Sequence, residues 1–372
     1  MAGRIFALVV KIAERCNLNC HYCYIYNHED QSWRVRPKLM SDAVFEQMLL
    51  RMREYCDRHA PHQMGLTFHG GEPTLVGARR FDAMASKARA LLGDRLFGIS
   101  LQTNGTLVTD RWCEVLRRHG VRVGVSIDGP PAVHDAARVD HRGRGSHAAT
   151  ARGLRRLSEA GLVPSVLCVI VPGQSGVDAY DHFRALGMRR INFLLPDVSH
   201  DNKARFYGDY GPTPVADYLI PVFDRWMAED DPDVMVRLFW GLIRGMLGGA
   251  QETDAFGNPL MSYLVIETDG AIEALDALRV CDAGVAASGL NVASHGFDDL
   301  TQGAPLVNRF VHEGVPLCGT CGACPERDIC GGGYLPHRYA RATGFDNPSV
   351  WCADIKRLIA HIRQRLDHAK SA

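Results

Sequence analysis

The chain has 372 residues, of which 46% are hydrophobic and 23% charged, as in a globular protein with room for a catalytic domain and a smaller second one. Its 42 basic residues equal its 42 acidic residues, so the composition carries no electrostatic signature of nucleic-acid binding, and we expect no nucleic-acid partner. The apolar run near the N-terminus is too short to span a bilayer and no cleavage site follows it, so we expect a cytoplasmic protein without membrane contact.

Short, continuous apolar runs alternate with helix-like stretches along the first half of the chain, as expected for parallel strands buried on both faces. The predicted strands are 6–12, 65–69, 98–102, 121–127, 163–171 and 191–195. The predicted helices are 41–56, 79–92, 109–118, 146–160 and 176–186, with Ser41 and Thr109 as N-caps. Six βα units are too few for a closed eight-stranded barrel. We therefore predict an α/β fold with an open, partial (β/α)6 barrel, whose chemistry lies in loops after the strands.

The pattern of the chain changes after the sixth predicted strand. Residues 215–229 and 232–247 are predicted helices, and 263–268 is a short strand followed by an Asp269-Gly270 turn and a second short strand. We predict a core domain over 1–210, a helical bridge over 211–255 and a C-terminal domain over 256–372, with the boundary in the segment 254–258.

Three cysteines follow the first predicted strand: Cys16, Cys20 and Cys23, in the spacing CxxxCxxC with Tyr22 before the last. Three thiolates in one compact loop suit a soft metal ion or an iron–sulfur cluster. A zinc ion with a distant fourth ligand, or thiols without a metal, would explain the same spacing. A [4Fe-4S] cluster on three cysteines would leave one iron free for another ligand.

Residues 5–200 resemble the radical S-adenosylmethionine (SAM) superfamily, because CxxxCxxC, Gly-Gly-Glu-Pro, Asn-Gly and Asp-Gly motifs occur in the family order. The resemblance implies a [4Fe-4S] cluster on Cys16, Cys20 and Cys23 whose open iron binds SAM. It also implies SAM-binding residues after the later strands, with an arginine pairing with the SAM carboxylate: Gly70, Gly71, Glu72, Pro73, Thr103, Asn104, Ser126, Asp128 and Arg138. Glycines would let the backbone approach SAM closely, whereas each motif alone would be only a turn.

A second cysteine group lies near the C-terminus: Cys318, Cys321, Cys324 and Cys330, with Cys281 before it and Cys352 after it. Repeated CxxC with Gly-rich spacers is a metal-binding pattern, and zinc is one interpretation. The segment resembles the SPASM extension of radical SAM peptide maturases, which implies an auxiliary [4Fe-4S] cluster on Cys321, Cys324, Cys330 and Cys352. Leu275 and Tyr334 occupy positions where that extension usually has cysteines, so we expect a further auxiliary cluster to be absent or incomplete. Cys281 and Cys318 are candidate additional ligands.

The tail of the chain, from Cys330-Gly-Gly-Gly-Tyr334 to Cys352, looks like that of FxsB-type maturases, which form cyclophanes in ribosomally made precursor peptides. The implied reaction joins an aromatic ring carbon to a side-chain β-carbon through a 5′-deoxyadenosyl radical, and the auxiliary cluster takes the surplus electron. The implied partners are the precursor peptide and a reductant protein such as flavodoxin or ferredoxin.

Other outcomes stay open at this point. A radical SAM enzyme could instead epimerise a residue, form a thioether or oxidise a side chain, and a distant alternative is a non-catalytic module that binds zinc or an iron–sulfur cluster. The general base is unknown from the sequence. Asp197, which follows the sixth predicted strand, is a candidate.

Overall fold

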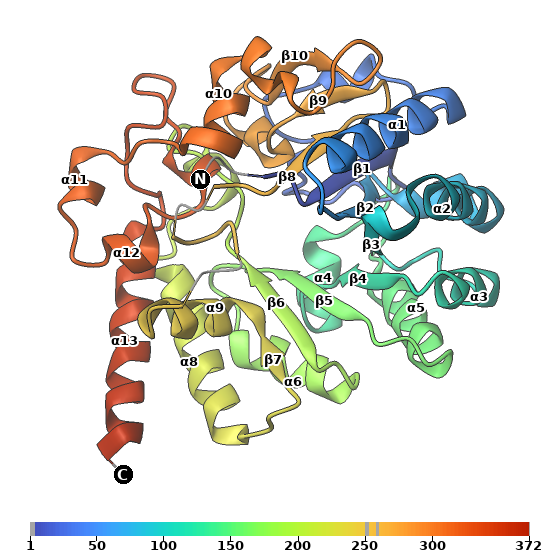
Figure 1. Ribbon diagram of the computed structural model, residues 1–372. Helices are drawn as coiled ribbons and strands as arrows, with labels where there is room; N and C mark the ends of the chain where they lie inside the picture. Colours follow the sequence, from blue (N-terminus) through green and yellow to red (C-terminus); the bar gives the residue numbers. More distant parts are fainter. Residues whose placement is uncertain (1–3, 250–252, 258–259, 372) are drawn as a thin grey trace.

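The computed structural model describes residues 4–249, 253–257 and 260–371. Within these residues, ten strands form one sheet in the order β10-β9-β8-β1-β2-β3-β4-β5-β6-β7 (Figure 1). The strands are β1 (Ala7–Ala13), β2 (Met64–Gly70), β3 (Leu96–Thr103), β4 (Arg122–Ser126), β5 (Ser165–Val169), β6 (Arg190–Leu194), β7 (Met235–Val236), β8 (Tyr263–Ile266), β9 (Ala271–Glu273) and β10 (Ala287–Asn291).

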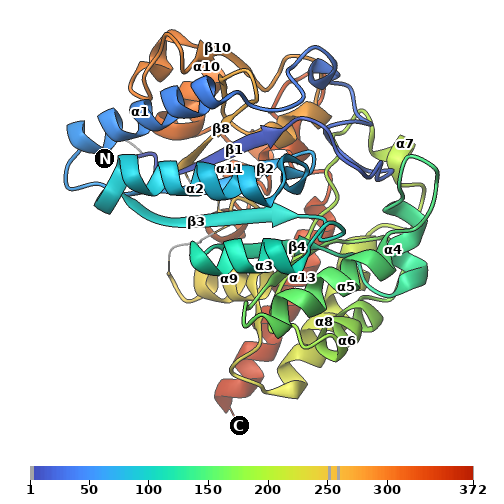
Figure 2. The ribbon, with the colours of Figure 1, turned by 90° about the vertical axis from the view of Figure 1, so that its right-hand side faces the viewer.

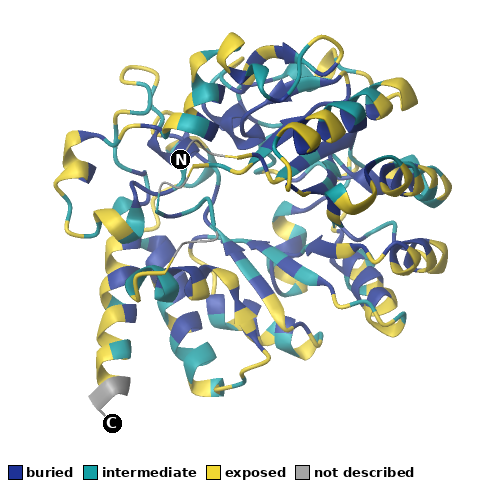
Figure 3. Cartoon of the chain, in the orientation of Figure 1, coloured by how far each residue is buried: buried dark blue, intermediate teal, exposed yellow. Residues whose placement is uncertain are grey.

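Strands β1 to β6 are mutually parallel and neighbour one another in sequence order, which confirms the predicted parallel α/β fold. Their central residues, such as Val10, Phe68 and Val125, are fully buried, and Figure 3 shows this buried layer running through the sheet. Because parallel strands present their carboxyl ends at one edge, the loops that carry the predicted motifs lie at the same edge of the sheet.

Helices connect these strands and cover the outer side of the curved sheet (Figure 2). They are α1 (Asp42–Arg58), α2 (Ala78–Leu92), α3 (Asp110–Arg118), α4 (Pro131–Ala137), α5 (His147–Glu159) and α6 (Gly176–Ala185). The predicted N-caps are confirmed: the Ser41 hydroxyl accepts a hydrogen bond from the Val44 N–H at 3.1 Å, and the Thr109 hydroxyl accepts one from the Trp112 N–H at 3.4 Å.

The bridge after β6 contains α7 (Lys203–Phe206), α8 (Pro214–Glu229) and α9 (Arg237–Met246). The predicted start of its last helix at residue 232 is wrong, because Met235 and Val236 form β7 and pair with the edge strand β6. The chain leaves α8 through Asp230 in a left-handed conformation, with φ of 50°. Met235 then donates its N–H to the Arg189 carbonyl at 2.8 Å, so the sheet edge holds this segment extended.

The C-terminal part continues the same sheet. Strand β8 lies parallel to β1, and β9 and β10 follow as antiparallel neighbours after a turn in which Gly270 has φ of +86°. The remaining helices are α10 (Pro305–Asn308), α11 (Gly319–Gly322), α12 (Arg327–Cys330) and α13 (Cys352–Ser371). The predicted boundary segment 254–258 is described as far as Gly257, and Asn258 lies outside the described residues. Over the described ranges, no helix is long and apolar enough to cross a membrane.

Helix α13, which sequence reasoning missed, packs against α8 (Figure 1). Its buried residues recur at helical spacing: Ile355, Leu358, Ile359 and Ile362. The Asp354 carboxylate accepts hydrogen bonds from the Val215 and Ala216 N–H groups at 2.7 and 3.0 Å, and so satisfies free donors in the first turn of α8. The segment after Cys352 is therefore fixed to the bridge.

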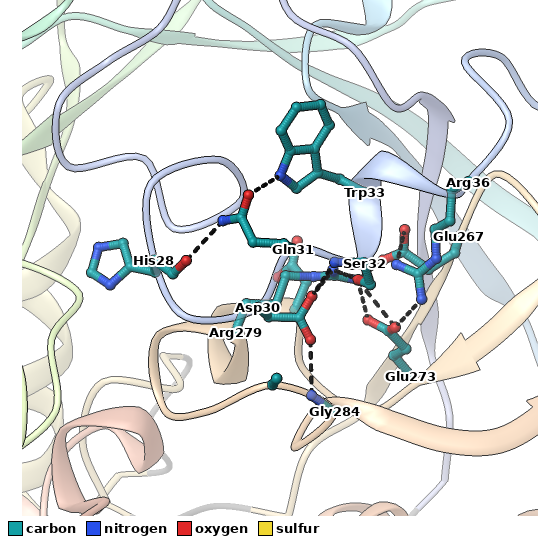
Figure 4. A network of polar contacts seen from close by, with 12 residues as sticks. His28, Asp30, Gln31, Ser32, Trp33, Arg36, Glu267, Glu273, Arg279 and Gly284 are labelled. Atoms are coloured by element: carbon teal, nitrogen blue, oxygen red, sulfur yellow. Dashed lines mark hydrogen bonds and ion pairs between the residues drawn. The ribbon is translucent and has the colours of Figure 1, made fainter.

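A buried network of charges joins the loop after the first cysteine group to the C-terminal part (Figure 4). The fully buried Arg279 guanidinium contacts three carboxylates at 2.9 to 3.1 Å: Asp30, Glu267 and Glu273. Arg36 contacts Glu267 at 2.9 Å and Glu273 at 2.6 Å. Ionised groups persist in a protein interior only when they are paired, so each member of this network requires the others.

We expect Arg279→Met to lower the free energy of unfolding by about 3–5 kcal/mol, because it leaves buried carboxylates without their cation. Arg111→Met is the matched control, since the Arg111 side chain is 54% exposed and forms its ion pair with the exposed Glu114 at 2.6 Å; its effect should stay within about 1 kcal/mol. Urea unfolding of anaerobically purified protein measures both. Equal losses in the two variants would contradict a structural role for the network.

Candidate functional site

The predicted motif residues meet at the carboxyl edge of the parallel strands. Asn104, just after β3, places its side-chain amide 3.7 Å from the Cys16 Sγ and 2.9 Å from the Asn17 side-chain Oδ1. Asp128, after β4, accepts hydrogen bonds from the Tyr22 hydroxyl and, at 3.1 Å, from the Val169 N–H of β5. The loop of the first cysteine group is thus fixed by the loops after β3 and β4 and by β5.

Cys16, Cys20 and Cys23 are free thiols in this loop. Burial raises the pKa of Cys16, and the neighbouring Glu72, Cys23 and Cys20 raise it further, which places the three cysteines within electrostatic range of one another. Burial also raises the pKa of Cys23, to about 11. A bound metal cluster would supply the positive charge that stabilises these thiolates.

Glu72 connects the ends of β2 and β3. Its carboxylate accepts hydrogen bonds from the Thr74 N–H at 2.9 Å, the Thr74 hydroxyl, the Thr103 hydroxyl at 2.7 Å and the Asn104 N–H at 2.8 Å. Burial raises its pKa. The structure therefore shows Glu72 and Thr103 holding the two loops together, with the Glu72 carboxylate directed at protein donors.

The two glycines before Glu72 are required by packing inside the protein. A Cβ at Gly70, whose φ is +142°, would lie 2.1 Å from the Ala13 carbonyl oxygen. A Cβ at Gly71 would lie 1.9 Å from the Tyr26 hydroxyl and 2.6 Å from the Arg15 backbone. Close approach of this loop to the end of β1 therefore requires both glycines, and the close approach to SAM that the resemblance implies stays a prediction.

Arg138 lies over the cysteine loop, with Nη1 2.5 Å from the Tyr22 hydroxyl and 3.7 Å from the Asp128 carboxylate. Its Nε is buried and has no hydrogen-bond partner in the described structure. Ser126 is nearby on β4, where its hydroxyl accepts a hydrogen bond from the Gln102 side chain at 2.9 Å. A buried guanidinium with an unsatisfied N–H fits a carboxylate ligand.

The second cysteine group surrounds one cavity. Cys321, Cys324, Cys330 and Cys352 line it together with Glu326, Arg327 and Lys356. Burial and a hydrogen bond with Cys318 raise the pKa of Cys321 to about 12, so Cys318 lies beside the set. Four thiols around a common space match the ligand number of a [4Fe-4S] cluster.

Cys281 is separate from both groups. It is buried, with Sγ 3.9 Å from the Pro336 carbonyl oxygen, and the charges that affect it come from Asp197, Asp201 and Asp282 rather than from thiols. Among the residues that the structure describes, no three His, Cys, Asp or Glu side chains are already arranged to hold a metal ion.

Leu275 and Tyr334, the two departures from the SPASM pattern, line one small cavity together with Asp254, Met261 and Leu335. The Tyr263 hydroxyl donates a hydrogen bond to the Asp254 carboxylate at 3.1 Å beside it. Apolar and aromatic side chains thus occupy positions where the pattern would place cysteine ligands.

Asp197 lies just after β6 and lines a second, larger cavity. Burial, with Asp276 and Asp254 nearby, raises its pKa to about 7. The sequence did not single out Asp276, whose carboxylate accepts a hydrogen bond from the Tyr24 hydroxyl at 2.8 Å and lies 3.4 Å from the Lys11 Nζ. Although burial alone would raise it, Lys11 and this hydrogen bond lower the pKa of Asp276. The sequence did offer one signal for Asp276: it directly follows Leu275, which occupies a position where the SPASM pattern usually has a cysteine.

Comparisons with known proteins identify relatives of this chain. A family model described as the radical SAM superfamily matches residues 10–186. A serine-type anaerobic sulfatase-maturating enzyme of Bacteroides thetaiotaomicron is 24% identical over 99% of this chain and 92% of its own length. A second such enzyme, from Klebsiella aerogenes, is 35% identical over 73% of this chain and 66% of its own length.

Solved structures show the same fold. The structure described as native anSMEcpe with bound AdoMet has a TM-score of 0.83 at 22% identity and covers 98% of both chains. Streptococcus suis SuiB bound to precursor peptide SuiA has a TM-score of 0.65 at 15% identity, covering 94% of this chain and 76% of that one. The likeness extends beyond the barrel into the C-terminal part.

We expect anaerobically purified protein to hold about eight irons, and the triple variant Cys16→Ala/Cys20→Ala/Cys23→Ala to hold about four, because each cluster contains four irons. Iron and acid-labile sulfide content measure this. Cys113→Ala, a buried cysteine of α3, is the control and should keep about eight. Zinc in place of iron and sulfide would exclude clusters.

The structure also separates the C-terminal cysteines. Cys330→Ala should remove about four irons, whereas Cys281→Ala should leave the iron content unchanged because its thiol faces the Pro336 carbonyl. The same iron and sulfide assay applies to both variants. Loss of iron from Cys281→Ala would place that thiol among the ligands instead.

Proposed function

The chain belongs to the radical SAM superfamily, and from this premise we propose that it modifies a ribosomally made peptide by removing a hydrogen atom from a side-chain β-carbon. The observation that carries the proposal is the cysteine loop at the carboxyl edge of the barrel, fixed by Asn104 and Asp128 beside the unsatisfied Nε of Arg138. When bound, the cluster supplies an electron that cleaves SAM, and the resulting 5′-deoxyadenosyl radical takes the hydrogen atom.

In this proposal Cys16, Cys20 and Cys23 hold the SAM-binding cluster, and Arg138 holds the SAM carboxylate. The remaining residues of the SAM site are those at the loop edge: Gly70, Gly71, Glu72, Pro73, Thr103, Asn104, Ser126 and Asp128. Among them, Glu72 and Thr103 act by holding the loops in place through the hydrogen bonds that join them. Five of these side chains are buried and would limit the access of water to a radical intermediate: Glu72, Thr103, Asn104, Asp128 and Arg138.

The modification that we propose is a cyclophane crosslink between an aromatic ring carbon and the β-carbon. The C-terminal segment from Cys330 to Cys352, which resembles FxsB-type maturases, supports it. The cavity beside Asp197, with its aromatic and aliphatic wall, offers space for a ring near the barrel edge. Cys321, Cys324, Cys330 and Cys352 would hold an auxiliary cluster that accepts the surplus electron, and a flavodoxin or ferredoxin would supply the initiating electron.

Oxidation of a side chain without crosslinking is the second candidate. Its support is the similarity to anaerobic sulfatase-maturating enzymes over nearly the whole chain. Both reactions begin with the same β-hydrogen abstraction, so the barrel residues would serve either one. They differ in the next reaction of the β-carbon radical, which either adds to an aromatic ring or is oxidised without forming a crosslink.

Incubation with SAM, reductant and the peptide encoded by a short neighbouring reading frame should give a product two hydrogen atoms lighter. Because oxidation of a serine to an aldehyde causes the same loss, the product must also resist a hydrazide probe and show no backbone fragments between the two joined residues in tandem mass spectrometry. A hydrazide adduct would favour side-chain oxidation, and an unchanged mass with inverted chirality would favour epimerisation.

A further inference from the structure

An open cavity of about 130 Å³ lies at the carboxyl end of β6. Its wall is mainly apolar, with Phe193, Leu195, Leu238 and Tyr334 on the apolar side. Its charged and titratable groups come from four separate segments: Asp197, Arg237, Asp254 and His337. Such a wall suits an aromatic side chain with a polar edge.

His337 is the unexplained group in this cavity. It is 1% exposed, and neither ring nitrogen has a hydrogen-bond partner of good geometry in the described structure, although the Pro196 carbonyl lies nearby. The Asp197 carboxylate is 3.9 Å from its Nε2, which is too far for a hydrogen bond. Since buried polar atoms nearly always have partners, an occupant of the cavity would satisfy these nitrogens.

Burial lowers the pKa of His337 to about 3, so its ring is neutral and offers one donor and one acceptor. Asp197 on the facing side is 27% exposed and reachable from the cavity. The titratable groups around Asp197 are the carboxylates of Asp254 and Asp276, the thiol of Cys281, the ring of His337 and the hydroxyls of Tyr24, Tyr207 and Tyr334, and the Arg237 side chain lines the same cavity. The Tyr207 hydroxyl has no hydrogen-bond partner in the described structure. The raised pKa of Asp197, about 7, suits a group that accepts a proton at neutral pH.

We propose that this cavity holds the aromatic ring of the peptide substrate, and that Asp197 takes the proton that leaves the ring carbon; the inference rests on the crosslinking reaction proposed above. The β-carbon radical adds to the ring carbon and forms the new carbon–carbon bond. The ring then carries an unpaired electron and still holds its C–H. Loss of the proton to Asp197 and of one electron to an iron–sulfur acceptor restores the aromatic ring.

Because His337 is neutral and lacks a hydrogen-bond partner, the cavity should prefer an aromatic ring that carries its own N–H or O–H. A phenol or an indole can complete a hydrogen bond with His337, whereas a phenyl ring leaves its nitrogens unpaired. A buried His337 ring without a hydrogen-bond partner costs free energy, so a phenyl side chain should bind more weakly. His337 is therefore a positioning residue, and tyrosine or tryptophan is the substrate class.

The first experiment compares wild type with Asp197→Asn, using the peptide encoded beside this gene with deuterium on its aromatic ring. We expect crosslinked product to fall about a hundredfold, the loss typical of a missing general base. Formation of 5′-deoxyadenosine should continue, because hydrogen abstraction precedes the lost step. The ring-deuterium isotope effect should rise from near unity, since proton loss becomes rate-limiting. Asp197→Glu should restore part of the product.

Asp233→Asn, at a carboxylate that is 70% exposed, is the matched control and should behave as wild type. Iron content shows whether each variant is loaded. An Asp197→Asn variant that crosslinks at the wild-type rate, or that loses 5′-deoxyadenosine together with product, overturns the inference. A wild type that forms no ring-to-β-carbon bond overturns the crosslinking function itself, and the two failures are thereby distinguished.

The second arm tests His337 with peptides that carry tyrosine or phenylalanine at the crosslinked position. Wild type should prefer tyrosine about tenfold in kcat/KM, mainly through KM, because one buried hydrogen bond differs. His337→Leu should remove this preference while kcat for the phenylalanine peptide stays within about twofold of wild type. A preference that survives in His337→Leu, or is absent in wild type, overturns the assignment of His337.

Discussion

The arrangement of the site depends on the ion pairs that the buried Arg279 guanidinium forms with three carboxylates. The guanidinium holds Asp30, shortly after the cysteine loop, against Glu267 at the end of β8 and Glu273 in β9. Asp276 begins the same short helix that carries Arg279. The network therefore fixes two segments in one geometry, with Asp30 and Arg279 249 positions apart. It also fixes the Tyr24–Asp276 hydrogen bond next to Cys23.

The buried acidic residues fall into two groups, according to whether a cation lies close to the carboxylate. Lys11 compensates Glu267 at 2.8 Å and Asp276 at 3.4 Å, so these carboxyl groups stay ionised. Asp197 has no cation at comparable distance among the ion pairs of the described residues, and burial next to other carboxylates makes it hold its proton more strongly. Asp276 and Asp197 are therefore both buried, but the pKa of Asp276 is lowered and the pKa of Asp197 is raised.

Local patterns in the sequence were enough to predict the barrel and the positions of the cysteines. Apolar runs predicted β1 to β6, Ser41 and Thr109 predicted two helix starts, and the spacing of Cys16, Cys20 and Cys23 predicted a compact loop after β1. Contacts between distant segments could not be predicted, because no local pattern records them: the Tyr24–Asp276 pair joins residues 252 positions apart. The start of α9 was also misjudged, since it depends on pairing with a neighbouring strand.

The position of β8 beside β1 has a consequence for how the chain can be divided. Residues Ala7 to Val10 pair with β2 on one side and with β8 on the other, so the first strand is interior to the sheet. A shortened protein that ended before β8 would expose the backbone N–H and C=O groups of β1 as a free edge, and an unprotected edge promotes aggregation. The barrel and the cysteine-rich C-terminal part are therefore consecutive in the sequence but fold as one unit. We expect neither part to be soluble if the chain is cut between them.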